Sequence, residues 1–221
     1  MTEQKTVELV KRLSDIPYTG AISDILDEMG FHNQVLPKEI QSLDPDGTVA
    51  GTALTILGEP TGSEDPEVIF IPFLKMLGDV KPGNVLVNQP NDNLAAHLGE
   101  LSAETAQYRG ARGAVIDGGA RDTHYIMKLG FPVFARYKTP VDIVGRWRLV
   151  AHNVPIDIGR IHVDPGDYIL GDRDGVLVIP KSIAAEVVTK AEEVVKTENL
   201  VRKSILKGTH PVDAYRQFGR F

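Results

Sequence analysis

The amino-acid sequence predicts an α/β fold: a single domain whose central sheet is flanked by helices, with a long helix near the C-terminus. Strand-like and helix-like segments alternate between residues 81 and 135, which is typical of a parallel sheet covered by helices. Shorter strands separated by turn sequences follow between residues 158 and 179. Because a chain of 221 residues can bury one substantial core, we expect residues 1–221 to form one domain, with its core over about residues 45–180.

The first 30 residues predict two helices. Apolar residues at helical spacing indicate one helix that ends near Pro17 and another that runs from Thr19 to a stop at Gly30. Two apolar runs follow, over residues 49–57 and 68–71, and both predict strands.

The middle of the chain supplies the alternation of strands and helices. In order, it contains a short buried strand ending at Val87, a helix over residues 99–110, a strand over residues 114–116, a helix from Thr123 to about Leu129 and a strand over residues 132–135. A glycine-rich turn at Gly118 and Gly119 is expected between the second strand and the second helix. Ligands of such sheets bind at the carboxyl ends of the parallel strands.

After Pro140 the pattern changes. Residues 158–163, 167–170 and 175–179 predict short strands, joined by turn sequences that suit antiparallel hairpins. A long amphipathic helix is then predicted over about residues 182–207, with Ser182 as its N-cap and Gly208 beyond its end. We expect the aromatic residues of the tail to pack on their own domain or on a partner subunit; they are Tyr215, Phe218 and Phe221.

Composition excludes several classes of protein. The formal net charge of −6 and the absence of a basic stripe argue against nucleic-acid binding. There is no cysteine, which excludes disulfides and thiolate chemistry. No apolar run approaches the ~20 residues that span a bilayer. We therefore expect a cytoplasmic protein that contacts neither nucleic acid nor membrane.

Arg121 and Asp122 follow the predicted glycine turn. An arginine offers a planar fork of donors to a carboxylate or phosphate, and an adjacent aspartate can hold a hard cation. Taken alone, such a pair is more often a surface ion pair or a helix cap. A second feature lies twenty residues upstream, where Gly99 and Glu100 open a predicted helix whose first backbone N–H groups form an anion site. Both turns should face one crevice.

These residues together resemble the regulator of ribonuclease E activity A-like superfamily, which includes the 4-hydroxy-4-methyl-2-oxoglutarate/4-carboxy-4-hydroxy-2-oxoadipate aldolases. Its members carry a glycine and an acidic residue, a gap of roughly twenty residues and then Arg-Asp. The resemblance spans roughly residues 19–200 and implies a swivelling β/β/α-like fold. Further matching segments are residues 81–84, 130–135, 164–167 and 171–180.

The resemblance implies a role for each residue of the two turns. Asp122 would be the direct protein ligand of Mg²⁺ or Mn²⁺, and Glu100 would orient a water that shuttles protons. Arg121 would bind the carboxylate or oxygen of a 2-oxo acid. The backbone from Gly99 onward would hold the substrate carboxylate through the N–H groups of Leu101 and Ser102.

The activity implied is metal-dependent cleavage of a carbon–carbon bond in a small 2-oxo acid. Retro-aldol release of pyruvate and oxaloacetate decarboxylation both pass through a metal-stabilised enolate. The resemblance also implies a homotrimer or homohexamer with sites between subunits, in which Glu192 or Glu193 of a neighbour would reach the site. A non-catalytic regulator that binds a protein such as a ribonuclease is the alternative. A methyltransferase is disfavoured because no early glycine-rich nucleotide loop is present.

The chain departs from the family pattern after Asp122, where many members place an acidic residue within the next helical turn. Here His124 and Tyr125 occupy that turn, and they either contact a different substrate tail or are surface residues.

Other side chains carry weaker signals. The six histidines show no metal-binding spacing, and His152 is expected to be a loop residue. A Schiff-base lysine, Lys138 or Lys128, would need burial that no sequence feature indicates. Arg146-Trp147-Arg148 is the most concentrated cationic and aromatic segment, which predicts a subunit interface or a place for an acidic substrate.

Overall fold

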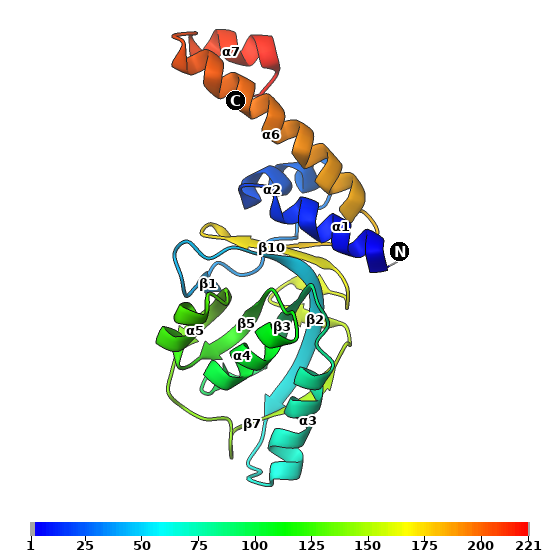
Figure 1. The fold of residues 1–221 in the computed structure, drawn as a ribbon, viewed down its shortest axis with the longest axis vertical. Coiled ribbons are helices and arrows are strands. Elements are labelled where there is room, and N and C mark those ends of the chain that lie inside the picture. Colours follow the sequence, from blue (N-terminus) through cyan, green and yellow to red (C-terminus); the bar gives the residue numbers. More distant parts are fainter. Residues whose placement is uncertain (1–2, 221) are drawn as a thin grey trace.

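The structure, a computed structural model, describes residues 3–220 and contains one large mixed sheet with helices packed against it (Figure 1). The strands of this sheet are β1 (Gln41–Ser42), β2 (Val49–Pro60), β3 (Asn84–Gln89), β4 (Ala96–Leu98), β5 (Gly113–Ala120), β6 (Val133–Lys138), β7 (Trp147–His152), β10 (Tyr168–Asp172) and β11 (Gly175–Ile179). They follow the order β1-β6-β5-β3-β2-β10-β11, with β4 beside β5 and β7 beside β2. The central strands β2, β3, β5 and β6 are parallel. A separate hairpin consists of β8 (Ile156–Ile158) and β9 (Ile161–Val163).

The helices of the described residues are α1 (Glu3–Ser14), α2 (Thr19–Glu28), α3 (Pro66–Gly78), α4 (Glu100–Tyr108), α5 (Thr123–Leu129), α6 (Ala184–Leu206) and α7 (Pro211–Phe218). Figure 1 shows α1 and α2 beside β10, while α6 runs outward from them and carries α7 at its far end. The helices α3, α4 and α5 lie lower in the same view, against the parallel strands. The predicted α/β fold with a long C-terminal helix is therefore confirmed.

The central strands are buried on both faces, which explains their nearly uninterrupted apolar sequences. In β2, Val49 and Ala53 join one apolar cluster, together with side chains of the β8–β9 hairpin. On the opposite face, Leu54 and Ile56 join a second cluster with side chains of α3, α4 and α5. A third cluster packs α1, α2 and α6 over β10 and β11.

Residues 68–71, predicted as a strand, lie inside α3, so that prediction was wrong. Asp65 caps this helix, because its side chain accepts a hydrogen bond from Glu67 N at 3.0 Å. Pro66 occupies the first turn, where its missing N–H costs nothing. A short apolar run fits either a strand or a helix, and these start signals decide in favour of the helix.

Two further boundaries differ from the prediction. Ser182 does not cap α6, which begins at Ala184 after Ile183, an N-cap residue without a side-chain cap hydrogen bond. Residues 158–163 form parts of two strands instead of one, because the chain reverses at Gly159 with a φ of +64°. The strands β1, β4 and β7 and the helix α7 were not predicted. Within residues 3–220, no helix combines the length and apolarity needed to cross a bilayer.

Trp147 is a core residue, whereas the sequence predicts that residues 146–148 form a subunit interface or receive an acidic substrate. It begins β7 with a fully buried side chain. Gly58 of β2 makes room for the indole, since a Cβ at this position would lie 2.1 Å from the ring. Arg148 pairs with Glu59 of β2, and Arg146 donates to the carbonyl oxygen of Val144 at 3.0 Å. Trp147 therefore offers no surface to a substrate or to another subunit.

Candidate active site

The N-terminus of α4 meets the turn between β5 and α5. Gly99 is the N-cap residue of α4, and the preceding strand β4 runs parallel to β5. Arg121 N donates to Leu98 O at 2.9 Å, and Glu100 N donates to Asp122 Oδ2 at 3.2 Å. The structure therefore brings the two predicted turns into contact at the carboxyl end of β5.

Gly99 leaves space for the two side chains of the turn at this close approach. A Cβ on Gly99 would lie 2.7 Å from Asp122 Oδ2 and 3.1 Å from Arg121 Nε, and the first of these distances is shorter than real contacts allow. Its φ of −126° is accessible to any residue, so backbone conformation is not the reason for the glycine. The reason is the space that the Arg121 and Asp122 side chains occupy.

Gly118 and Gly119 do not form the turn that the sequence predicts; both lie within β5. Each is a glycine because a ring packs against it. A Cβ on Gly118 would lie 2.6 Å from His97 Nδ1, and one on Gly119 would lie 2.4 Å from Tyr137 Cε2. The turn itself consists of Arg121 and Asp122, and the glycines let the rings support the strand that leads into it.

Asp122 adopts a left-handed backbone conformation, with a φ of 54°. Aspartate and asparagine enter this region more readily than other non-glycine residues. The Asp122 carbonyl begins α5 by accepting hydrogen bonds from Tyr125 N and Ile126 N, at 2.9 and 3.1 Å. Its side chain makes no cap hydrogen bond and is 44% exposed, so the carboxylate is accessible to a ligand.

Arg121 lies between two carboxylates. Its Nη1 donates to Asp142 Oδ2 at 2.7 Å, and its Nε lies 3.6 Å from Asp122 Oδ2. Burial works to raise the pKa of Asp142, but hydrogen bonds from Val144 N and from Arg121 outweigh it and hold the pKa below its ordinary value. Asp142 is therefore an ionised partner that orients the guanidinium.

Asp142 was missed in the sequence. It lies in the segment after β6, a parallel neighbour of β5. The rule that carboxyl ends of parallel strands share one edge could have found it.

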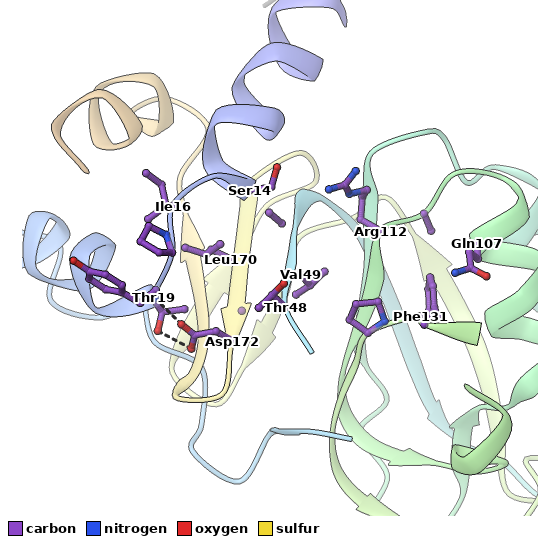
Figure 2. Close-up of a pocket in the computed structure, with 17 residues that line it drawn as sticks. Ser14, Ile16, Thr19, Thr48, Val49, Gln107, Arg112, Phe131, Leu170 and Asp172 are labelled. Atoms are coloured by element: carbon purple, nitrogen blue, oxygen red, sulfur yellow. Dashed lines mark hydrogen bonds between the residues drawn. The ribbon is translucent and has the colours of Figure 1, made fainter. Parts of the chain in front are cut away.

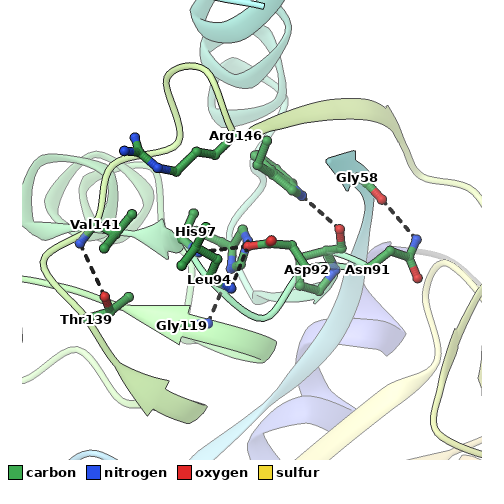
Figure 3. Close-up of polar contacts among 12 residues, drawn as sticks. Gly58, Asn91, Asp92, Leu94, His97, Gly119, Thr139, Val141 and Arg146 are labelled. Carbon is green, nitrogen blue, oxygen red and sulfur yellow. Dashed lines mark hydrogen bonds and ion pairs between the residues drawn. The ribbon is translucent and has the colours of Figure 1, made fainter. Parts of the chain in front are cut away.

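His97 lies on β4, beside the strand that leads into the site, and Figure 3 shows its polar contacts. Its ring is buried between Asp92, whose Oδ2 lies 3.1 Å from Nε2, and Gly119, whose N–H donates to Nδ1 at 3.2 Å. Burial lowers the pKa of His97 to about 4, although the Asp92 carboxylate opposes this shift. The neutral ring therefore carries its proton on Nε2 and accepts at Nδ1. The edge-to-face contact with Trp147, at 5.0 Å between centroids, completes the packing.

Two pockets adjoin Arg121. The first, of about 420 Å³, is lined by Asp122, Thr123 and Lys138 among others, and we call it the Asp122 pocket. The second, of about 220 Å³, is lined by the N-terminus of α4 and by side chains of α3, including Phe70 and Leu74. We call it the α3 pocket. Arg121 lines both pockets, so this residue can contact a ligand in either.

The other predicted residues divide between these pockets and the surface. Leu101 and Ser102 line the α3 pocket together with Gly99. His124 lines neither pocket; it is exposed on α5 and packs edge-on against Tyr125 at 5.6 Å.

The remaining candidates are exposed or pair with other side chains. Lys138 and Lys128 are both exposed, so neither has the burial that a Schiff-base lysine needs. His152 is paired with Asp79 at 2.9 Å, and it ends β7 instead of lying in a loop. Glu192 pairs with Arg12 of the same chain at 2.8 Å.

A larger pocket, of about 470 Å³, lies at the opposite ends of the parallel strands (Figure 2). It is lined by the connection between α1 and α2 and by the segments that begin β2, β5 and β6. Thr19 closes one side, because its backbone N and its Oγ1 both donate to the Asp172 carboxylate, at 2.7 and 2.9 Å. None of the predicted site residues lines this pocket.

Comparison with known proteins identifies the class to which this fold and site belong. The model of the Aldolase/RraA family, described as RraA-like, matches residues 19–178. The chain therefore belongs to the Aldolase/RraA family, as the sequence motifs predicted.

Particular relatives cover nearly the whole chain. A protein of Halalkalibacterium halodurans named "Putative 4-hydroxy-4-methyl-2-oxoglutarate aldolase" is 32% identical over 213 residues, which are 96% of this chain and 95% of the relative. An uncharacterised protein of Pseudomonas syringae pv. tomato has a similar solved structure, with a TM-score of 0.83 and 29% identity over 94% of this chain and 96% of its own. Streptomyces coelicolor RraAS2, described as an unusual member of the RNase ES inhibitor RraA protein family, has a TM-score of 0.78 and 28% identity over 88% and 96%.

Proposed function

We propose that this protein is a divalent-metal-dependent carbon–carbon lyase that releases pyruvate from a small 2-oxo acid. Retro-aldol cleavage and oxaloacetate decarboxylation would share one site, because each breaks the bond to C3 of the pyruvate unit and leaves an enolate that must be protonated. The observation that carries the proposal is the contact between the N-terminus of α4 and the Arg121–Asp122 turn. The aldolase name of the Halalkalibacterium relative supports the reaction class.

The donor set fits a hard divalent cation. Asp122 Oδ2 accepts the Glu100 N–H, and no hydrogen bond to Oδ1 is present among residues 3–220. Those residues contain no group of three or more acidic or histidine side chains that would enclose a metal. Mg²⁺ usually keeps several waters and takes one or two carboxylates, and Mn²⁺ accepts the same oxygen ligands. Bound at Asp122, such a cation would polarise the 2-oxo group of the substrate.

The residues around Asp122 would position the substrate. Arg121, already oriented by Asp142, would hold a carboxylate or the 2-oxo oxygen through its planar fork of donors. The first N–H groups of α4, at Leu101 and Ser102, lack partners within the helix and would hold the substrate carboxylate. Glu100 would orient the water that delivers a proton to C3 of the pyruvate unit.

A non-catalytic regulator that binds a ribonuclease is the second candidate function. The observation in its favour is the structural similarity to Streptomyces coelicolor RraAS2, whose description names an RNase inhibitor family. A protein-binding surface does not require an arginine and an aspartate held against a helix N-terminus. We therefore favour the lyase.

Pyruvate release over a panel of 4-hydroxy-2-oxo acids and oxaloacetate separates the two candidates. The assay couples pyruvate to lactate dehydrogenase and is run with Mg²⁺, with Mn²⁺ and with a chelator. We expect release that depends on the metal. If no member of the panel releases pyruvate with either metal, the lyase proposal fails and the regulator is favoured.

Substitution of Asp122→Asn tests the metal ligand. Asparagine tolerates the same positive φ and has nearly the same shape, so the fold should persist while the anionic ligand is lost. Because metal polarisation contributes several kcal/mol, we expect kcat/KM to fall roughly 100-fold or more. Asp46→Asn, at an exposed aspartate away from both pockets, is the matched control and should keep the parent value. Parent-level turnover in Asp122→Asn would reject the assignment.

A further inference from the structure

We infer that the substrate carries an apolar tail, a small alkyl or aryl group that occupies the α3 pocket while its 2-oxo acid head lies at Arg121. This inference rests on the proposed function and names the substrate class of the same site. It comes from the side chains that line the α3 pocket and from the charges that this pocket lacks.

Large apolar side chains are exposed together at this pocket. Phe70 and Leu74, four residues apart on one face of α3, are 40% and 56% exposed, and Leu101 at the start of α4 is 77% exposed. Ile69 and Met76 on another face of α3 are fully buried and anchor the helix. Phe70 and Leu74 are therefore not needed to attach α3, and grouped apolar exposure of this kind marks a binding surface.

The floor of the pocket is also apolar. Phe73 and Leu98 line it and are buried, and Ile143 also lines it. The volume of about 220 Å³ limits the ligand portion that fits there to a small group. An apolar tail would remove both its own surface and that of Phe70, Leu74 and Leu101 from water.

Charges in the α3 pocket disfavour a second carboxylate. Its lining contains one cation, Arg121, and one ionised carboxylate, Asp142, and these pair with each other at 2.7 Å. His97 also lines the pocket, but burial keeps it neutral near pH 7 because its pKa is about 4. A tail carboxylate would therefore lie near Asp142 without a cation of its own, which costs binding free energy.

The rival location for a tail is the Asp122 pocket. Lys138 lines it and is exposed, so a tail with a carboxylate would be directed there. Because Asp122 and its proposed cation occupy the same pocket, the tail and the metal would compete for space. Asp122 does not line the α3 pocket, so a tail there leaves that space free. In this inference the tail contacts α3 and does not contact His124, which lines neither pocket.

The experiment compares 4-hydroxy-2-oxo acids that differ only in the substituent at C4: isopropyl, phenyl or carboxylate. Pyruvate release is measured with Mg²⁺, and the result is the ratio of kcat/KM for apolar to carboxylated tails. We expect this ratio to be about tenfold or more in the parent protein. In Leu74→Lys the ratio should fall at least about tenfold, since the new ammonium favours a carboxylate. Leu200→Lys, at an apolar residue of α6 that is 53% exposed, is the matched control and should keep the ratio.

Each of the following outcomes overturns the inference. If the parent cleaves carboxylated substrates at least as well as apolar ones, the tail is not in the α3 pocket. The same conclusion follows if Lys138→Met changes the ratio and Leu74→Lys does not. The lyase proposal stands in both cases. If Leu74→Lys changes the mass of the assembly and not the ratio, the exposed side chains form a subunit contact. If no substrate of either kind releases pyruvate, the proposed function fails together with the inference.

Discussion

His97 shows how a single buried side chain supports the strand that carries the candidate site. It joins Asp92 in the loop before β4 to Gly119 in β5, and it packs on Trp147 of β7. The contact with Gly119 requires the neutral ring, because Nδ1 accepts the Gly119 N–H. A protonated ring would lose that acceptor and bury a charge, so protonation should loosen β5.

Substitution of His97 should change how stability depends on pH. The ordinary pKa is 6.5 and the folded value is about 4, so between these pH values the unfolded chain binds a proton that the folded protein does not. The stability contributed by neutral His97 is therefore complete above pH 6.5 and is lost as pH falls towards 4, by roughly 3 kcal/mol. In His97→Gln the free energy of unfolding should fall less over this interval. Urea denaturation at pH 7, 5.5 and 4.5 measures it.

The control for this prediction is His32→Gln, since the His32 side chain is largely exposed. That protein should show the pH dependence of the parent. If the free energy of unfolding of His97→Gln also depends on pH as in the parent, a neutral buried His97 does not contribute to acid sensitivity.

Among the secondary-structure elements, α4 and β4 are both joined to the β5–α5 turn by hydrogen bonds from backbone N–H groups. Glu100 N reaches Asp122, and Arg121 N reaches the last residue of β4. Because Gly99 has no side chain, the side chains of Arg121 and Asp122 can lie close to the start of α4.

Gly99→Ala should impair the site without unfolding the protein. The added methyl would meet Asp122 Oδ2 at 2.7 Å, so the Asp122 carboxylate must shift from its position beside α4. Since displacement of reacting groups by about 1 Å can cost roughly 100-fold, we expect a loss of that order in kcat/KM for pyruvate release. Gly62→Ala is the control, because a Cβ on Gly62 would contact nothing within 4 Å. Equal kinetics in both variants would show that the close approach is not needed.

At the scale of the whole molecule, apolar side chains remain exposed far from the α3 pocket. Tyr108 is 93% exposed at the end of α4, Leu206 is 81% exposed at the end of α6, and Tyr215 on α7 is 55% exposed. The helices α6 and α7 extend away from the sheet (Figure 1), so their surfaces are available to another chain. Such surfaces mark sites of association.

We expect the protein to associate with itself as a trimer or hexamer. Light scattering coupled to size exclusion should therefore give a mass three or six times that of the 24.1 kDa chain. Leu206→Glu should lower this mass if α6 takes part, because the charge would be buried at the contact. A mass equal to one chain at all concentrations would contradict the prediction.

Much of this architecture could be predicted because its signals are local. The alternation of strands and helices follows from apolar periodicity and glycine stops, and the meeting of Gly99 with Arg121 follows from the shared edge of parallel strands. The prediction failed at residues 68–71 because a run of four apolar residues has no distinguishing period. It failed at Trp147 because an aromatic residue between two arginines gives no sign of a glycine cavity in another strand.

From the sequence alone come the family, the α/β class and the pair of turns, since these depend on residue order and on short motifs. Only the tertiary structure assigns Asp142 to Arg121, places the rings of His97 and Tyr137 against Gly118 and Gly119, and groups Phe70, Leu74 and Leu101 around one pocket. The physical reason is that these contacts join segments far apart in the chain. They depend on packing and on the space between elements, which no local pattern records.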